Sequence, residues 1–248
     1  RHGRRHSVLK GQTMIVFIDV ETCPGQTADA RKAASESIKP PGTLKKPESI
    51  AAWWAESAPA AELEAWHKQS LDGGTRGELV SIAACTDVEG QQWVRCRSAD
   101  ESEAELLREF FETVETWQRQ EAEQAAGDPA WWPAECWPVA HNASFDLGYL
   151  WRRAIVCRVP LPQWVPGPMA RAGKDYGDTM TAWAGLRGTV SLDTLCRALG
   201  LDSPKGDLHG AGVFAAWQAG EYERIAAYNL RDAVSVRDVW QRLQGRGL

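Results

Sequence analysis

Two acidic side chains stand two positions apart in the stretch FIDVE, residues 17–21. The longer run 14–21 is rich in β-branched residues and is typical of a buried strand. Because residues i and i+2 of a strand project from the same face of a sheet, we expect Asp19 and Glu21 to lie side by side. Adjacent carboxylates repel each other, and burying them is costly unless a cation lies between them. The pair suggests a metal site, with a solvated acidic pair at a strand end as the alternative.

A further acidic residue follows a short apolar stretch. The sequence HNASFD, residues 141–146, predicts a polar turn that leads from a strand into a helix, with Asp146 at the start of the helix. A helix N-terminus would stabilise an acid there whatever its function. The neighbouring side chains favour a nucleic-acid site, because the amide of Asn142 can hold the turn and the ring of Phe145 can lie under a base. His141 is another candidate for substrate contact.

The last motif lies in AAYNLRDAV, residues 226–234. Tyr228 and Asp232 are spaced i and i+4 on an expected helix, so they share one face of it. Taken alone, they could be an ordinary pair on a helix surface. Together with the earlier acids they form the ordered set D-x-E, D and Y-x-x-x-D. Carboxylate oxygens suit Mg²⁺ or Mn²⁺ and not zinc, and two such ions about 4 Å apart can stabilise both reacting oxygens in phosphodiester hydrolysis.

Regular elements must position these side chains, and the hydrophobic pattern predicts where they lie. In one expected helix, apolar residues from Leu106 to Trp117 follow the spacing of a single buried face. Ser191 is a plausible N-cap of another. Strands are expected at 14–21, 78–86, 91–97 and 137–141, and helices at 101–124, 144–157, 191–199, 211–219 and 222–243. This order predicts a mixed α/β layer structure. The long connections 24–77 and 158–190 are candidate insertions beside a functional face.

The three motifs resemble those of the DEDD superfamily, the DnaQ-like, ribonuclease H-like 3′–5′ exonucleases that include polymerase proofreading domains. One branch of that superfamily ends in H-x-x-x-x-D and the other in Y-x-x-x-D. Position 227 is Ala and position 228 is Tyr, so the chain is similar to the tyrosine (DEDDy) branch. The stretches SLDTLCRALGL and GVFAAWQAGEYERIAAYNLRD, with Lys205 between them, resemble predicted exonucleases related to the proofreading domain of family B polymerases.

This resemblance implies a ribonuclease H-like fold, a central mixed β-sheet flanked by helices. The helical insertion, 24–77, between the first two strands departs from the shorter connection that is usual in proofreading domains. It also implies that Tyr228 orients the attacking water. The residues implied to be catalytic and to bind two divalent metal ions, Mg²⁺ or Mn²⁺, are Asp19, Glu21, Asp146 and Asp232. The candidate substrate contacts, from the resemblance and the motifs together, are Thr22, His141, Asn142, Phe145 and Lys205.

The composition of the chain excludes several classes of function and of site. The net charge of −5 argues against a broad basic surface that grips duplex nucleic acid. The six cysteines contain no C-x-x-C pair, which removes the main support for zinc-ribbon and thioredoxin-type sites. No signal peptide or membrane-spanning stretch is visible, so we expect a cytoplasmic protein. Residues 1–13 are interpreted as an N-terminal extension or a tag, and 14–248 as one domain.

Tryptophans and lysines in the insertion allow two interpretations. Trp53, Trp54 and Trp66 could stack on bases, but packing of inserted helices against the body is favoured. A flap over the active-site cleft, with Lys45 and Lys46 on phosphates, is the competing hypothesis.

The function favoured by these observations is two-metal-ion 3′–5′ exonuclease activity on single-stranded nucleic acid with a 3′ end, with DNA favoured over RNA. One alternative is a ribonuclease H-like module that binds nucleic acid without cutting it. Another is a different two-metal phosphodiesterase, such as an endonuclease or a nucleotide hydrolase. Nothing in the sequence identifies a protein partner.

Overall fold

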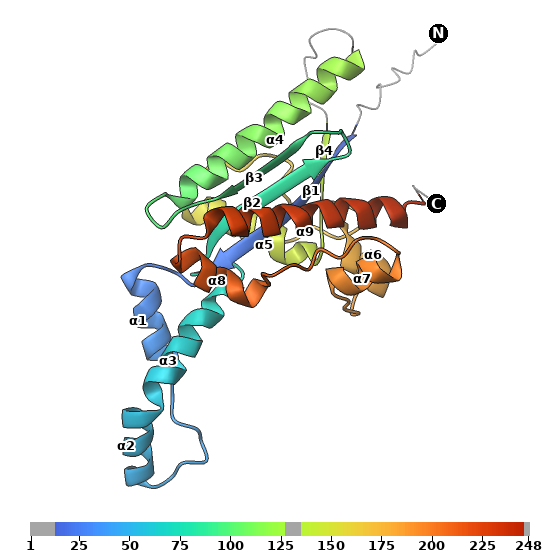
Figure 1. Cartoon of the computed structure of the whole chain (residues 1–248). Helices are drawn as coiled ribbons and strands as arrows, with labels where there is room; N and C mark the ends of the chain where they lie inside the picture. Colours follow the sequence, from blue (N-terminus) through green and yellow to red (C-terminus); the bar gives the residue numbers. More distant parts are fainter. Residues whose placement is uncertain (1–12, 127–134, 246–248) are drawn as a thin grey trace, which may run out of the picture.

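A computed structural model describes residues 13–126 and 135–245. At its centre lies a five-stranded sheet with the order β3-β2-β1-β4-β5 (Figure 1). The strands are β1 (Thr13–Cys23), β2 (Glu78–Thr86), β3 (Gln92–Cys96), β4 (Glu135–Ala140) and β5 (Gly177–Asp178). β1 runs antiparallel to β2 and parallel to β4, so the sheet is mixed. The predicted α/β architecture is confirmed and is consistent with a ribonuclease H-like fold. Of the predicted N-terminal extension, 1–13, only Thr13 lies within the described residues, and it begins β1.

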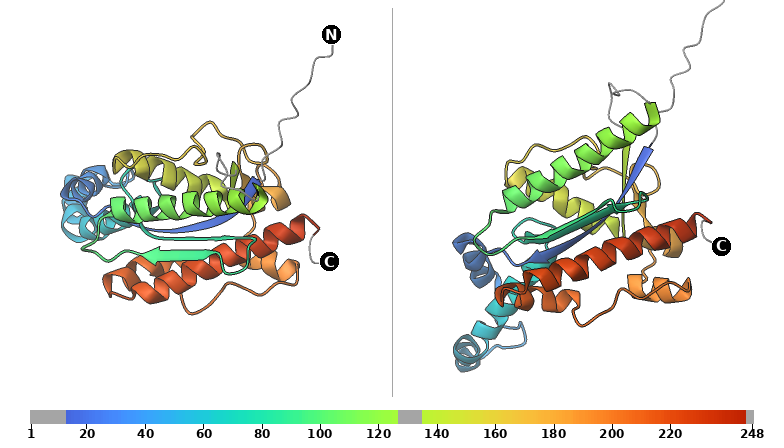
Figure 2. Two further views of the ribbon diagram at one scale, coloured as in Figure 1. Left: turned by 90° about the horizontal axis from the view of Figure 1, so that it is seen from above. Right: turned by 45° about the horizontal axis from the view of Figure 1, so that its top comes forward.

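Helices cover both faces of this sheet. Figures 1 and 2 show α4 (Glu103–Ala126) and α5 (Ala143–Val156) on one face and the long α9 (Tyr222–Leu243) on the other. The shorter helices are α1 (Ala28–Ser37), α2 (Pro47–Glu56), α3 (Ala58–His67), the 3-10 turn η1 (Lys68–Leu71), α6 (Thr179–Ala184), α7 (Leu192–Ala198) and α8 (Gly210–Gln218). Within the described ranges no helix is long and apolar enough to cross a membrane. All six cysteines are free thiols.

The alternation of side chains along β1 decides which face carries the acids. Val16, Ile18 and Val20 belong to the core beneath α4 and α5. Phe17 packs instead with Val236 of α9. Because the side-chain period of a strand is two residues, Asp19 and Glu21 continue the Phe17 row on the α9 face.

Segment 24–77 carries α1, α2 and α3 and extends away from the sheet, with α2 at its far end (Figure 1). Trp66 is buried at the near end, where its indole Nε1 donates to the Gly25 carbonyl at 2.8 Å and the Arg31 guanidinium lies 3.1 Å from the ring centroid. Trp53 and Trp54 form an edge-to-face pair, with ring centroids 5.0 Å apart, on α2, a helix without any buried residue. The favoured packing of all three indoles against the body is therefore right for Trp66 and wrong for Trp53 and Trp54.

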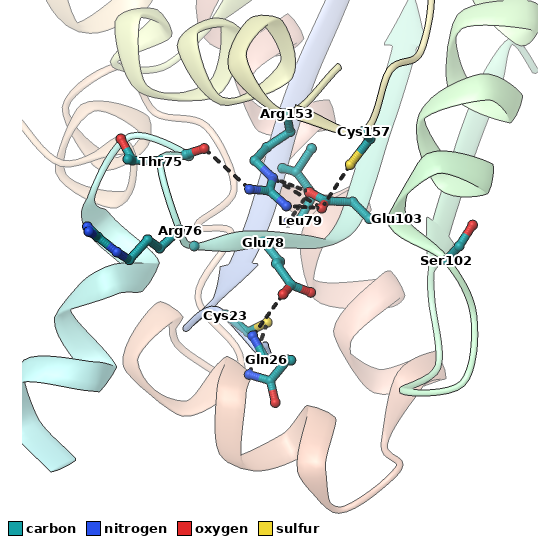
Figure 3. Close-up of polar contacts among 12 residues, drawn as sticks. Cys23, Gln26, Thr75, Arg76, Glu78, Leu79, Ser102, Glu103, Arg153 and Cys157 are labelled. Carbon is teal, nitrogen blue, oxygen red and sulfur yellow. Dashed lines mark hydrogen bonds and ion pairs between the residues drawn. The ribbon is translucent and has the colours of Figure 1, made fainter. Parts of the chain in front are cut away.

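Figure 3 shows two polar contacts where this segment meets the sheet, the buried ion pair of Arg153 with Glu103 and the hydrogen bond from Gln26 to Glu78. Arg153 of α5 binds Glu103 of α4, with Nη2 2.5 Å from Oε2, and the same Glu103 accepts a hydrogen bond from the backbone N–H of Leu79. Beside this pair, Glu78 binds the Arg97 guanidinium at 2.7 Å and accepts a hydrogen bond from the N–H of Gln26. The start of segment 24–77 and the strand that follows it are thereby held together next to the end of β1.

Candidate metal and nucleic-acid site

Three carboxylates converge on the α9 face of the sheet. Asp19, Glu21 and Asp232 each place one oxygen within 4.8 Å of the other two, the one such group found among the described residues. β1 and β4 pair only as far as Phe17 and Val139, so β1 continues beyond the carboxyl end of β4 as it reaches the acids. The carboxyl ends of strands in open α/β sheets commonly form ligand-binding crevices.

A cavity of about 300 Å³ lies over these carboxylates. Its lining comes from β1, from the start of α5 and the turn before it, from the start of α7 and the segment between α7 and α8, and from α9. The lining residues are Asp19, Val20, Glu21, His141, Phe145, Asp146, Leu192, Asp193, Pro204, Lys205, Leu208, His209, Tyr228 and Asp232. Every predicted catalytic residue lines this cavity, whereas no lining residue comes from segment 24–77.

Asp146 reaches the cavity from the first turn of α5. It is buried, and its Oδ1 accepts a hydrogen bond from the backbone N–H of Val20 at 3.1 Å. This bond ties α5 to β1 between the two acids of the strand. Asp146 is not in the group of three close oxygens, but it lies near enough to raise the pKa values of Asp19 and Glu21.

Burial and mutual repulsion disfavour the ionised form of these acids. Burial is the main cause that raises the pKa values of Asp19 and Glu21 well above their ordinary range, and the neighbouring carboxylates raise them further. Burial likewise raises the pKa of Asp146 to about 8 and that of Asp232 to about 6. Such a cluster needs either protons or cations to be stable, and carboxylate oxygens are the ligands that Mg²⁺ and Mn²⁺ prefer. The donor set therefore fits the two ions expected from the sequence.

This electrostatic arrangement predicts how stability depends on pH in the absence of metal. Asp146 binds its proton more tightly in the folded protein than in the unfolded chain, since its pKa is raised from 3.8 to about 8. Its protonation therefore stabilises the fold fully below pH 3.8, and this contribution is lost as the pH rises through about 8. Between pH 3.8 and about pH 8, the melting temperature of the metal-free wild type should therefore fall with rising pH relative to that of Asp146→Asn. Saturating Mn²⁺ should reduce the difference, and a wild type that gains stability over Asp146→Asn with rising pH would contradict the prediction.

Tyr228 lies one turn before Asp232 on α9, and its hydroxyl lies close enough to the Asp232 carboxylate to lower the pKa of that carboxyl. Burial raises the pKa of the Tyr228 phenol far above its ordinary value, with further increases from Glu21, Asp232 and Asp19. The hydroxyl therefore keeps its proton at neutral pH. It is suited to orient a water molecule by hydrogen bonding and is unsuited to remove a proton from it.

The turn into α5 is built around a residue that the sequence interpretation left without a role. Asp178 accepts hydrogen bonds from the backbone N–H groups of Asn142 and Ala143 at 3.1 and 3.2 Å. The same carboxylate caps α6 by accepting from the N–H groups of Met180 and Thr181. Asn142 adopts a left-handed φ of 58°, a conformation that Asn tolerates better than most residues. The local signal was available, because an Asp before a short helix is a typical N-cap.

The predicted substrate contacts divide into two groups. Phe145, His141 and Lys205 line the cavity, whereas Thr22 and Asn142 do not. The Thr22 hydroxyl donates to the Ser70 carbonyl at 2.7 Å, so it serves the base of segment 24–77.

Both ring nitrogens of His141 are engaged, one with the Thr179 hydroxyl and one with the Val190 carbonyl, each at 2.9 Å. The Lys205 ammonium lies 2.9 Å from the carboxylate of Asp193. Ser191 caps α7, and Asp193 in its first turn binds Lys205, Arg197 and Ser203. His209 caps α8 through its ring.

Comparison with known families supports the chemistry of this site. Residues 136–246 match a family described as predicted 3′–5′ exonucleases related to the exonuclease domain of PolB. The match includes Asp146, Tyr228 and Asp232, and it stops short of β1 and segment 24–77. The resemblance to exonucleases of this kind is thereby confirmed, and nuclease activity is supported at this coarse level. No curated protein matches the chain.

Proposed function

We propose that this protein is a metal-dependent 3′–5′ exonuclease that hydrolyses phosphodiester bonds at the 3′ end of single-stranded nucleic acid, with DNA favoured over RNA. The observation that carries the proposal is the convergence of Asp19, Glu21 and Asp232 on one cavity that Asp146 and Tyr228 also line. The exonuclease family matched by residues 136–246 supports the same reaction class. We take residues 14–248 to act as one domain.

The carboxylates of Asp19, Glu21, Asp146 and Asp232 would hold two ions, Mg²⁺ or Mn²⁺. When bound, such ions supply Lewis-acid stabilisation of the charge that develops on the attacking and leaving oxygens. The chain's own contribution is to fix the ligands on β1, α5 and α9, where the Val20 N–H holds the Asp146 carboxylate by a hydrogen bond. The phenolic Oη of Tyr228 would then orient the attacking water and keep its own proton.

Two lining side chains would contact the substrate. The ring of Phe145 lies against Tyr149, with centroids 5.0 Å apart, and would support the terminal base. The Lys205 ammonium, exposed at the cavity, would exchange its contact with Asp193 for a phosphate. His141 would shape the cavity wall, because its ring nitrogens are already engaged.

Tyr228→Phe should lower kcat by about 10²-fold, within the range for a positioned proton-handling group. The ring remains and the four carboxylates are unchanged, so Mn²⁺ affinity should stay close to that of the wild type. Tyr222→Phe on the first turn of the same helix is the matched control, since Tyr222 does not line the cavity. Turnover measured on a labelled oligonucleotide and Mn²⁺ binding measured by calorimetry check both parts. A collapse of Mn²⁺ affinity in Tyr228→Phe would show a structural role instead.

Cleavage of linear and circular strands, combined with a measurement of their binding, distinguishes the alternative functions. An exonuclease requires an end, so circular single-stranded DNA should survive while a linear strand of the same sequence is shortened. An endonuclease would cut both substrates, and a nucleotide hydrolase would cut neither. A binding module without activity would bind both strands and leave both uncut, whichever divalent ion is present.

Segment 24–77 provides a further test of substrate contact. No residue of the segment lines the cavity, so the structure gives no support for a flap that covers it. Lys45 and Lys46 are nevertheless exposed and close in sequence to the exposed indole of Trp54. If they bind phosphates, Lys45→Ala with Lys46→Ala in an Asp232→Asn background should weaken oligonucleotide binding and reduce the salt slope by about one unit per lost contact. An unchanged affinity and slope would assign the segment a different role, and Lys32→Ala, which removes a charge paired with Glu36 on α1, is the control.

A further inference from the structure

Two buried polar side chains behind the carboxylates have no hydrogen-bond partner. Both amide atoms of Asn229 and the hydroxyl of Ser81 are buried and unpaired, and both residues are completely inaccessible to solvent. A buried donor or acceptor that forms no hydrogen bond costs about 1–3 kcal/mol. Such groups require a specific explanation in a native structure.

The register of the sheet places Ser81 beside the site. Ser81 of β2 is the direct cross-strand partner of Glu21, and Ala83 is that of Asp19. Side chains opposite each other in an antiparallel pair lie on the same face, with Cβ atoms about 5 Å apart. The Ser81 hydroxyl therefore lies on the α9 face, within reach of the Glu21 side chain.

The packing of α9 places Asn229 over the same part of β2. One turn before it, Ile225 packs with Val80 and Cys23, and one turn after it, the carbonyl of Ala233 accepts a hydrogen bond from the Cys85 thiol. Asn229 is spaced i+4 from Ile225 and i−4 from Ala233, so it shares their sheet-facing side. It therefore lies over β2 between Val80 and Cys85, the stretch opposite Asp19 and Glu21.

Building on the proposed function, we propose that Ser81 and Asn229 are positioning residues that donate hydrogen bonds to the Glu21 carboxylate when metal is bound. A carboxylate that gives one oxygen to a cation still has acceptor sites on the other. Ser81 contributes one O–H donor and Asn229 two N–H donors, all from the side of the site that is closed to solvent. Hydrogen bonds of this kind orient metal ligands, and their loss typically costs 10–100-fold in metal affinity or activity.

The paired variants Ser81→Ala and Ser81→Thr test this role, because the second retains the hydroxyl. We expect Ser81→Ala to weaken binding of Mn²⁺ alone, measured by calorimetry without substrate, by about tenfold. Ser81→Thr should remain close to the wild type. Asn229→Leu should weaken Mn²⁺ binding similarly, with a lower kcat and an unchanged KM. Thermal stability in EDTA should not decrease in Ser81→Ala, since an unpaired buried hydroxyl is removed.

Ser235→Ala is the matched control. Ser235 is also buried and lies on the same helix as Asn229, but it lies near Cys196 and does not line the cavity. Its Mn²⁺ affinity should equal that of the wild type. Wild-type Mn²⁺ affinity in Ser81→Ala would overturn the positioning role and leave the proposed function intact, even if Asn229→Leu fails to fold. A wild-type protein that binds no Mn²⁺ would overturn both.

Discussion

Asp232→Asn is expected to lower the rate of 3′-end hydrolysis by about 10³-fold or more, equivalent to at least about 4 kcal/mol of lost transition-state stabilisation. Asp232 is the residue through which α9 joins the two acids of β1, and its oxygen lies within 4.8 Å of theirs. Its substitution removes a proposed metal ligand and the carboxylate that lies beside the Tyr228 hydroxyl. Asp146→Asn should produce a loss of the same order, since Asp146 lines the same cavity from α5.

Asp238→Asn provides the control for Asp232→Asn. Asp238 is on the same helix, pairs with its neighbour Arg237 and does not line the cavity. Its substitution should leave turnover unchanged. Without metal, Asp232→Asn should be at least as stable as the wild type at neutral pH, because like-charge repulsion is relieved. Turnover of Asp232→Asn equal to that of Asp238→Asn would refute the assignment of Asp232 as a ligand.

The second large effect concerns stability. Arg153→Met should lower the free energy of unfolding by about 3–5 kcal/mol, because it leaves the buried carboxylate of Glu103 without its cationic partner. The Arg153 and Glu103 side chains are only 8% and 6% exposed, and together they join α4, α5 and β2 near the base of segment 24–77. Urea denaturation with EDTA present measures the loss separately from any effect on metal binding.

Arg224→Met is the comparison for this pair. Arg224 also binds carboxylates, those of Asp207 and Glu221, but its side chain is 40% exposed. Surface pairs of this kind contribute about 0–1 kcal/mol. Equal losses in Arg153→Met and Arg224→Met would show that burial of the Arg153–Glu103 pair has no special effect on stability.

Much of the fold could be predicted from the sequence because the hydrophobic residues recur at regular helical or strand spacing. Residues 106–117 repeat apolar side chains at helical spacing, and α4 buries that face against the sheet. β2 begins and ends where its apolar run does. Ser191 caps α7, as its position before the apolar run predicts. In each of these elements, local preference and burial favour the same conformation.

Other elements gave no periodic signal. β5 consists of only two residues, and it is defined by its pairing with β4 and by close packing at Gly177, where a Cβ would lie 2.8 Å from the Val139 side chain. The apolar sequence of α2 predicts burial, yet the helix lies at the far end of a projecting segment. These features depend on contacts between residues distant in sequence, which composition does not encode.

The candidate site, too, could be predicted only in part from the sequence. The spacing of Asp19 and Glu21 implied a shared face, and the motif order implied that Asp146 and Asp232 join them. Sequence reasoning did not identify the hydrogen bond from Val20 to Asp146, the capping of two helices by Asp178, or the pairing of Asp193 with Lys205. Those interactions arise only when β1, α5 and the segment after α7 come together.

The central claim is that this cavity removes nucleotides from a 3′ end with the help of divalent metal. Single-stranded DNA labelled at its 5′ end, incubated with the protein and Mg²⁺ or Mn²⁺ and sampled over time, tests it most directly. We expect a ladder of products shortened step by step from the 3′ end, absent when EDTA is added and absent with Asp232→Asn. Products that retain the full 3′ end, or a ladder that persists in EDTA, would contradict it.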